Sequence, residues 1–397
     1  MIKPTIRFKS DDGSEYPEWE KKTLGDIGSV AMCKRIYKEQ TSAEGDVPFF
    51  KIGTFGGEPD AFISRELYET LKHEYPFPEK GATLLSASGT IGRQVVYNGE
   101  DAYYQDSNIV WLDHDDTVVD GFLRQFYNVV TWQGLEGSTI KRLYNKTILE
   151  TPFCRPCLSE QRKIAALLSS VDDVIAAQAA EVAVWEQRKK GVMQKLFSQE
   201  VRFKADDGSD FPEWDEKTLG ECCEQLSKAI DPRQFPDDEY IEYSMPAFDN
   251  GAHANVVMGN MMQSVRKVLS KPCVLINKLN VRKKRIWLVE EPTNNSVASS
   301  EFVPLASEEL DLSFLSHAAQ TEQFTSHLLD CSSGSSNSQK RVTPDIILGY
   351  RLMVPSLPEQ RKIADCLSSF DEVIAKARDE LAAWQELKKG LLQQMFV

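Results

Sequence analysis

Residues 158–197 have the sequence LSEQRKIAALLSSVDDVIAAQAAEVAVWEQRKKGVMQKLF, and residues 357–396 have the sequence LPEQRKIADCLSSFDEVIAKARDELAAWQELKKGLLQQMF. Apolar residues recur in both at alternating spacings of three and four, which predicts two long helices with a coiled-coil seam. At about 1.5 Å per residue, each helix would be about 57 Å long. Two such helices most simply pack on each other, antiparallel if the halves are related by a pseudo-twofold axis; the alternative is that each is a core element of its neighbouring domain.

The predicted seams include one tryptophan in each helix. Their residues are Ile164, Leu168, Val171, Ile175, Val182, Trp185, Val192 and Leu196 in the first helix, and Ile363, Leu367, Phe370, Ile374, Leu381, Trp384, Leu391 and Met395 in the second. We expect both tryptophans to be core residues, because they occupy seam positions.

A second near-copy precedes the variable part of each half. The stretch IRFKSDDGSEYPEWEKKTLGD at 6–26 matches VRFKADDGSDFPEWDEKTLGE at 201–221. Two long matches at nearly the same offset establish an internal repeat of entry segment, variable domain and helix. Trp19 and Trp214 are predicted to anchor these entry segments by packing.

The regions between the matched segments are only faintly alike, but the likeness keeps its order. Residues 81–98 resemble 271–289, and DSNIVWL at 106–112 resembles SSEFVPL at 299–305. Short β-rich runs at 82–85, 93–97, 274–276 and 285–289 lie between Gly, Asn and Pro residues, which predicts mixed α/β (α+β) domains. Both variable domains therefore share one predicted fold and differ in surface.

Composition limits the classes of protein. No run of 18 apolar residues predicts a membrane span, no secretory signal is visible, and eight cysteines in 397 residues are typical of reduced thiols in the cytoplasm. The net charge of -14 argues against a protein that coats nucleic acid, because such proteins need a basic surface. DNA binding would require local basic clusters, or a partner that supplies most phosphate contacts.

The sequence shows no recognisable motif for catalysis or for metal binding. Cys154 and Cys157 have half of a zinc-site spacing, but the repeat places Met353 and Ser356 at the matching positions, so we expect no metal. Neither a phosphate-binding loop nor a methylation motif is present, so we expect neither a cofactor nor a catalytic site.

Together the repeated segments resemble the specificity subunits of type I restriction-modification systems. The likeness covers the whole chain and is carried by the entry segments at Arg7–Gly25 and Arg202–Gly220 and by the two helices that begin with Glu-Gln-Arg-Lys-Ile-Ala. The resemblance implies a non-catalytic subunit with two target recognition domains, each of which recognises one half of a bipartite double-stranded DNA target. It also implies that the helices set the spacing and hold two modification (methyltransferase) subunits, with restriction (helicase-nuclease) subunits joining them.

On this reading the chain divides into six parts. They are an entry segment at 1–21, target recognition domain 1 at 22–156, a spacer helix at 157–198, a second entry segment at 199–216, target recognition domain 2 at 217–355 and a C-terminal spacer helix at 356–397.

DNA contacts require side chains that can donate to phosphates or reach base edges. The densest basic turn follows an apolar strand in the second half, its aligned turn in the first half is rich in Ser and Gly, and a Lys-Arg pair recurs at one offset. The predicted DNA-binding residues are Lys34, Arg35, Ser88, Thr90, Arg93, Lys141, Arg142, Lys278, Asn280, Arg282, Lys283, Lys284, Arg285, Lys340 and Arg341. For each group the alternative is ordinary solvated surface charge or a helix-stabilising surface pair.

Two other functions remain open from the sequence. A repeat-built scaffold could assemble protein partners through its helices without nucleic acid, and a degenerate enzyme is the third possibility. A DNA-specificity subunit is favoured because the repeated entry segments and helices resemble that family over the whole chain.

Overall fold

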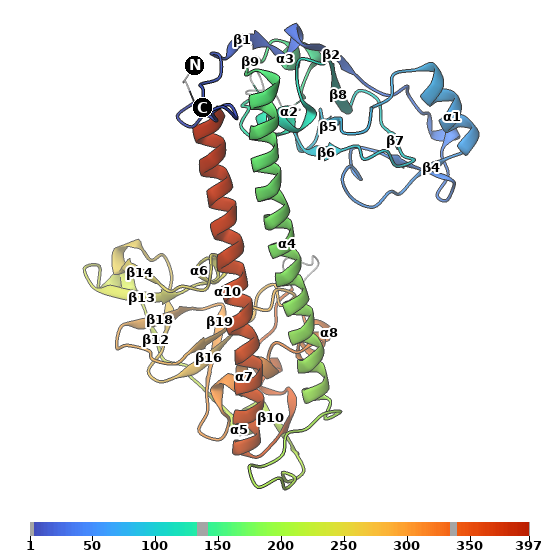
Figure 1. Cartoon of the computed structure of the whole chain (residues 1–397). Helices are drawn as coiled ribbons and strands as arrows, with labels where there is room; N and C mark the ends of the chain where they lie inside the picture. The colour runs from blue at the N-terminus through green and yellow to red at the C-terminus, as the bar shows by residue number, and fades with distance from the viewer. Residues whose placement is uncertain (1–3, 133–141, 334–339, 397) are drawn as a thin grey trace. The chain divides into compact units, whose positions relative to one another are not determined.

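The computed structural model describes residues 4–132, 142–333 and 340–396. It divides into two compact units: unit 1 comprises residues 1–179 and 379–397, and unit 2 comprises residues 180–378. The helices α4 (Leu158–Phe197) and α10 (Leu357–Phe396) begin and end where the repeated sequence predicts (Figure 1). Because both helices cross the boundary between the units, each unit contains the start of one helix and the end of the other.

Unit 1 combines short strands and helices with the start of α4. Its elements are β1 (Glu20–Thr23), β2 (Gly28–Ala31), β3 (Val47–Phe50), β4 (Phe62–Ile63), α1 (Arg65–Glu74), β5 (Thr83–Ser86), β6 (Gln94–Val96), β7 (Tyr103–Tyr104), β8 (Ile109–His114), α2 (Asp120–Tyr127), α3 (Asn145–Leu149) and β9 (Pro152–Arg155). The strands form sheets in the orders β2-β8-β5-β6 and β4-β3-β7, with β1 and β9 as a separate pair. Phe122, Leu168 and Met395 belong to one buried cluster, so the domain packs on both long helices.

Unit 2 repeats this plan around the end of α4 and the start of α10. Its elements are β10 (Asp215–Thr218), α5 (Leu219–Cys222), β11 (Glu224–Gln225), β12 (Ala229–Ile230), β13 (Glu239–Tyr243), α6 (Met245–Asp249), β14 (Asn255–Met258), β15 (Arg266–Val268), β16 (Cys273–Asn277), β17 (Ile286–Val289), β18 (Ser296–Ser299), β19 (Phe302–Ala306), α7 (Leu312–Ala318), α8 (Glu322–Asp330), α9 (Pro344–Leu348) and β20 (Arg351–Val354). The sheets have the orders β11-β19-β16-β17 and β12-β15-β18-β13-β14, with β10 and β20 as a pair. Leu196, Phe314 and Leu367 share one core cluster.

Corresponding strands pair in the same way in the two units. The antiparallel pair β1–β9 recurs as β10–β20, the hairpin β5–β6 recurs as β16–β17, and the parallel pair β3–β7 recurs as β13–β18. The predicted mixed α/β class with an internal repeat is therefore confirmed.

The Glu-Gln pair at the start of each long helix explains why the motif recurs. Glu160 is fully buried and accepts hydrogen bonds from Arg7 Nε at 3.0 Å, Arg7 Nη2 at 2.8 Å and Trp19 Nε1 at 3.0 Å. Burial of a carboxylate is tolerated only when it is paired and hydrogen-bonded, and this one is both. The same contacts recur in unit 2 among Arg202, Trp214 and Glu359.

The glutamine of the motif holds a different element. Gln161 accepts a hydrogen bond at 2.9 Å from the backbone N–H of Val119, the residue before α2, and Gln360 accepts one at 2.8 Å from that of Asp311, the residue before α7. Each helix start thus fixes its entry segment through the glutamate and its domain helix through the glutamine. The prediction that Trp19 and Trp214 anchor the entry segments is confirmed.

The two long helices run antiparallel within each unit. In unit 1, Lys388 Nζ lies 2.5 Å from Asp172 Oδ1, and in unit 2, Lys189 Nζ lies 2.6 Å from Asp371 Oδ1. Seam residues near the helix starts are buried, as predicted. Trp185 and Trp384 are only half-buried, so the prediction that both are core residues is wrong. The ring of Trp185 lies 6.2 Å from that of Phe370, but a side chain as large as tryptophan is seldom covered completely. Among the described residues, none of the helices combines the length and apolarity needed to cross a bilayer.

Candidate nucleic-acid interface

In unit 2 the predicted basic turn is the loop of the β16–β17 hairpin. Strand β16 ends at the buried Asn277, whose side-chain Nδ2 donates to the carbonyl of Leu279 at 2.9 Å and whose Oδ1 accepts from the backbone N–H of Arg285 at 3.2 Å. Asn280 adopts a φ of 54°, in the left-handed region that Asn tolerates better than most residues. A buried side chain therefore fixes the shape of this loop.

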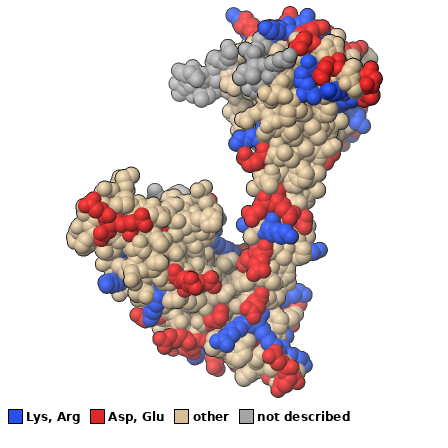
Figure 2. Space-filling view, turned by 60° about the vertical axis from the view of Figure 1, so that its left-hand side comes forward, with Lys and Arg blue, Asp and Glu red and all other residues tan. Residues whose placement is uncertain are grey.

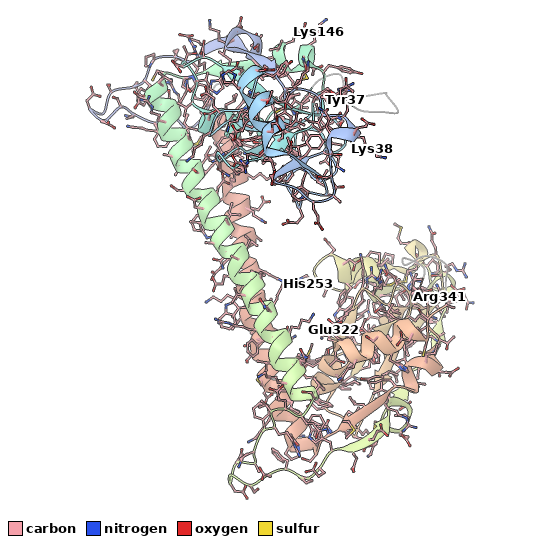
Figure 3. All side chains as sticks on the ribbon, turned by 90° about the vertical axis from the view of Figure 1, so that its right-hand side faces the viewer. Tyr37, Lys38, Lys146, His253, Glu322 and Arg341 are labelled. Atoms are coloured by element: carbon pink, nitrogen blue, oxygen red, sulfur yellow. The ribbon has the colours of Figure 1, made fainter. Side chains whose placement is uncertain are left out.

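A second predicted basic segment closes onto the same loop. The backbone N–H of Val342 donates to the carbonyl of Lys278 at 3.0 Å, and the backbone N–H of Asn280 donates to the carbonyl of Lys340 at 2.7 Å. Arg341 forms a β-bridge with Leu279, and Figure 3 shows its side chain on a different part of unit 2 from Glu322. Two stretches about 60 residues apart in sequence thus form one surface, which we call the unit 2 basic surface: residues 278–284 and 340–341.

The basic side chains of this loop differ in availability. Arg285 is buried and makes two hydrogen bonds to Asp249, at 2.8 and 2.7 Å, which hold the pKa of that carboxyl below its usual value. Lys284 lies 3.2 Å from Glu322. Arg282 is exposed and forms no ion pair among the described residues, so it is the cation of this loop with most freedom to reach a ligand. The structure gives Arg285 a role in holding the loop to α6.

Two further cations of the surface have acidic neighbours. Lys283 Nζ is 3.7 Å from Asp249, and Arg341 Nη2 is 3.0 Å from Glu301. The side chains of Lys283 and Arg341 remain largely exposed to solvent. Ion pairs at such positions are weak, so either cation can leave its acidic neighbour for another anion.

Unit 1 brings its predicted residues together in the same manner. The backbone N–H of Leu143 donates to the carbonyl of Ala87 at 2.8 Å, and Arg142 forms a β-bridge with Ser88 in the β5–β6 loop. Arg142 Nη2 also donates to the carbonyl of Ser107 at 2.9 Å. Lys141, predicted beside Arg142, lies outside the described residues.

Two of the other unit 1 candidates, Arg35 and Ser88, contact the loop between β7 and β8. Arg35 Nε donates to Asp106 Oδ2 at 2.8 Å, and Ser88 Oγ donates to Asn108 Oδ1 at 3.0 Å. Residues 35, 88 and 142 thus meet at residues 106–108, and together they are called the unit 1 polar surface. Figure 3 shows the labelled Tyr37 and Lys38 close together on this unit.

Three other predicted residues of unit 1 have individual settings. Arg93 is exposed but donates to the carbonyl of Phe55 at 2.8 Å, Lys34 Nζ lies 4.6 Å from the ring centre of Tyr75, and the carbonyl of Thr90 accepts from Ser86 Oγ. Lys34 and Thr90 are exposed at the surface.

Some residues that organise these surfaces were not singled out from the sequence. These residues are uncharged or acidic, and a criterion based on positive charge does not select them. They are Asn277, Glu301, Ser107 and Asn108. The faint alignment of DSNIVWL with SSEFVPL was the available signal, because it places Asn108 and Glu301 at matching positions beside the two loops.

Charge on the exposed surface is mixed. On the face in Figure 2, Lys and Arg side chains form small groups between Asp and Glu side chains, with wide uncharged areas. Within the described ranges, no group of three or more His, Cys, Asp or Glu side chains is arranged to hold a metal ion.

A family model for the type I restriction modification DNA specificity domain matches the chain twice, over residues 16–183 and 212–383. The chain belongs to this specificity family. Each match covers a variable domain together with most of the long helix that follows it, so the family's unit is the repeated unit of this chain.

Relatives of this specificity family match over part or all of the chain. A putative type I restriction enzyme specificity subunit of Haemophilus influenzae is 51% identical over 150 residues, which are 38% of this chain and 39% of that protein. The type I restriction enzyme MjaVIII specificity subunit of Methanocaldococcus jannaschii is 25% identical over 97% of this chain and 94% of its own length.

Solved structures of the specificity family have the same fold. The S subunit of a type I restriction-modification system from M. genitalium aligns with a TM-score of 0.59 at 16% identity, over 100% of this chain and 99% of that one. A chain from a structural study of complex assembly and conformational transition in the type I R-M system aligns with a TM-score of 0.52 at 14% identity, over 96% of this chain and 98% of that one.

Proposed function

We propose that each unit of this specificity subunit recognises one half of a bipartite DNA duplex, through the unit 1 polar surface and the unit 2 basic surface. The observation that carries the proposal is that backbone hydrogen bonds join a hairpin loop to Leu143, next to Arg142, in unit 1 and to residues 340–342 in unit 2. Donor side chains on an ordered loop can present hydrogen bonds to base edges, while neighbouring cations contact phosphates. The two surfaces differ in residues, as two different half-sites require.

We further propose that the chain binds DNA firmly only in a complex. Its net charge is -14, and cations of both surfaces, such as Arg35 and Arg341, already have acidic partners. Since phosphate neutralisation supplies much of the affinity for DNA, two modification subunits held by the helices would provide most of it. The chain itself would be non-catalytic and cytoplasmic, with methyl transfer performed by those subunits and cleavage by restriction subunits.

Exchange of one variable domain tests the bipartite reading. Replacement of residues 217–354 by the corresponding domain of another member of the family is expected to change one half of the recognised site and leave the other half unchanged. Footprinting of the complex with its modification subunits measures this outcome. A change in both halves, or protection that is indifferent to sequence, would contradict the proposal and favour a scaffold without nucleic acid.

A single side chain tests the unit 2 basic surface more sharply. Substitution Arg282→Ala is expected to weaken binding of the assembled complex to its target by about 1–3 kcal/mol if Arg282 contacts a base. Preference among bases would then relax in one half-site only. Competition binding with targets substituted at each position measures both effects.

A matched control separates this role from a general loss of charge. Arg233 is exposed in the same unit, and its guanidinium is paired with the nearby Asp231, so Arg233→Ala should leave target affinity unchanged. Equal losses for the two variants would show that the loop has no special role. A uniform loss for Arg282→Ala across all sequences would make Arg282 a phosphate contact.

A further inference from the structure

Unit 2 carries an exposed apolar patch at one edge of its five-stranded sheet. Its members are Phe235, Val256, Met258 and Met261, with 46%, 64%, 38% and 73% of their surfaces exposed. Scattered exposed apolar residues are normal, but several together on one surface mark an interaction site. We call these four residues the edge patch.

Backbone contacts hold the members of the edge patch together. Val256 and Met258 alternate along β14 and so project from the same face of the strand. The backbone N–H of Asn260, next to Met261, donates to the carbonyl of Pro236 at 3.1 Å. Gly259 packs so closely on the carbonyl of Phe235 that an added Cβ would lie 2.1 Å from its oxygen. The patch is therefore an ordered surface.

The strand that bears the patch has an open edge. β14 is the last strand in its sheet and pairs only with β13 among the described residues (Figure 1). The corresponding strand of unit 1, β4, is closed on its outer side, because Phe62 and Ser42 exchange backbone hydrogen bonds of 2.9 and 3.0 Å, and its Ile63 is buried. At this strand position, and among the described residues, the edge is thus open in unit 2 and covered in unit 1.

Acidic residues border the edge patch. Asp237, Asp238 and Glu239 are consecutive and exposed, and Glu239 lies directly across the strand pair from Met258. None of the three forms an ion pair within the described part of the chain. On unit 2, Figure 2 shows Asp and Glu side chains gathered beside uncharged surface.

We propose that the open edge of β14 binds an extended segment of a partner protein, which adds as a strand and carries apolar residues alternating with Lys or Arg. Strand addition obtains affinity from main-chain hydrogen bonds and specificity from alternate side chains. The apolar residues of the segment would cover Val256 and Met258 on one face of the sheet. The cations that alternate with them would project from the other face and would be attracted by the exposed Asp237 and Asp238 just before β13. We expect one such segment per chain, because the corresponding strand of unit 1, β4, is already covered by Ser42 on its outer side.

Charge excludes two other occupants of the edge patch. DNA phosphates would face three carboxylates, and the exposed Arg233 close to Phe235 in sequence is already paired with Asp231 at 2.7 Å, so this surface is distinct from the unit 2 basic surface. A second copy of the chain would place its own acidic border against this one, and charged residues on an edge strand disfavour such self-pairing. The negative charge of the acidic border thus disfavours self-association and favours binding of a basic strand.

Two end-capped nine-residue peptides test the proposal on the intact chain, one alternating Lys and Val and the other alternating Glu and Val. We expect the Lys peptide to bind at least tenfold more tightly by calorimetry, and to protect the amides of β14 from hydrogen exchange. Val256→Asp should weaken its binding at least tenfold, although the added carboxylate increases general attraction for a cationic peptide. The triple substitution of Asp237, Asp238 and Glu239 by Asn, Asn and Gln should abolish the preference between the peptides.

The control variant is Val201→Asp, at an apolar position of unit 2 that is 48% exposed and outside the patch. It should bind the Lys peptide as the parent chain does. Equal binding to the parent and Val256→Asp chains, or no protection of β14, would overturn the proposal. Self-association of the parent chain in sedimentation velocity, lost on Val256→Asp, would instead assign the edge to a second copy.

Discussion

Replacement of Glu160 by alanine is expected to lower the free energy of unfolding of unit 1 by about 3–5 kcal/mol, the usual cost of removing one partner from a buried ion pair. Glu160 is fully buried, and the side chain of Arg7 is 13% exposed, so the substitution leaves a guanidinium without its main partner. It also leaves Trp19 Nε1 without an acceptor, which adds to the cost.

The measurement is urea unfolding of the intact chain followed by a probe in each unit, because a chain of two units need not unfold in one step. Only the unit 1 transition should move for Glu160→Ala, and only the unit 2 transition for Glu359→Ala. Glu18→Ala is the matched control: Glu18 lies 3.9 Å from Arg7 but is exposed, so little change is expected. If Glu160→Ala and Glu18→Ala were equally mild, the buried carboxylate would not hold the entry segment.

The stability of unit 2 should fall on acidification in a way that unit 1 does not share. Its buried His317 has a pKa lowered to about 4, mainly by burial and then by the nearby charge of Lys189, against smaller opposite effects of Asp371 and Asp311. His317 Nε2 lies 3.3 Å from Ser368 Oγ. Its Nδ1 lies 3.9 Å from Asp371 Oδ2 and has no hydrogen-bond partner among the described residues.

The sign follows from proton binding. The unfolded chain takes up this proton near pH 6.5 and the folded chain only near pH 4, so between these values protons favour the unfolded state. Stability should be unaffected above pH 6.5, decline as pH falls through this window, and have lost up to about 3 kcal/mol near pH 4. Urea unfolding at a series of pH values measures the decline.

The repeat supplies the matched variant for this prediction. In unit 1 the position that corresponds to His317 is occupied by Gln125. The side chain of Gln125 donates a hydrogen bond to Asp172 at 2.8 Å, and Asp172 also forms an ion pair with Lys388. His317→Gln should therefore remove the decline from unit 2 relative to the parent chain. Parallel pH profiles for the two chains would show that His317 titrates normally and that other groups govern acid sensitivity.

The long helices were predictable residue by residue because their apolar spacing persists over 40 residues, a signal that depends on no distant contact. The hairpin strands were also found, since turn residues bound each short apolar run. The roles of Glu160 and Gln161 were not predictable, because their partners lie more than 150 and about 40 residues away in sequence. The Glu-Gln motif could be seen in the sequence, but its structural role could be explained only from the folded chain.

The candidate surfaces show the same limit. Arg282 and Arg285 are indistinguishable in the sequence of one basic turn, but Asp249, 36 residues before Arg285, accepts hydrogen bonds from Arg285 and forms no ion pair with Arg282. The β16–β17 loop contacts Lys340 and Arg341 through backbone hydrogen bonds between segments distant in sequence, which no local sequence pattern predicts. Sequence therefore located the basic segments, and only tertiary contacts distinguish structural cations from those left for a ligand.

The division of the long helices between the units has a consequence for synthesis of the chain. Unit 2 is one continuous stretch, residues 180–378, and can fold once that stretch has left the ribosome. Unit 1 begins at the N-terminus but its core includes Leu392 and Met395, and Thr5 donates its backbone N–H to the carbonyl of Gln394. Unit 1 is therefore synthesised first but completed last. Its apolar core stays uncovered until the final turns of α10 have been made.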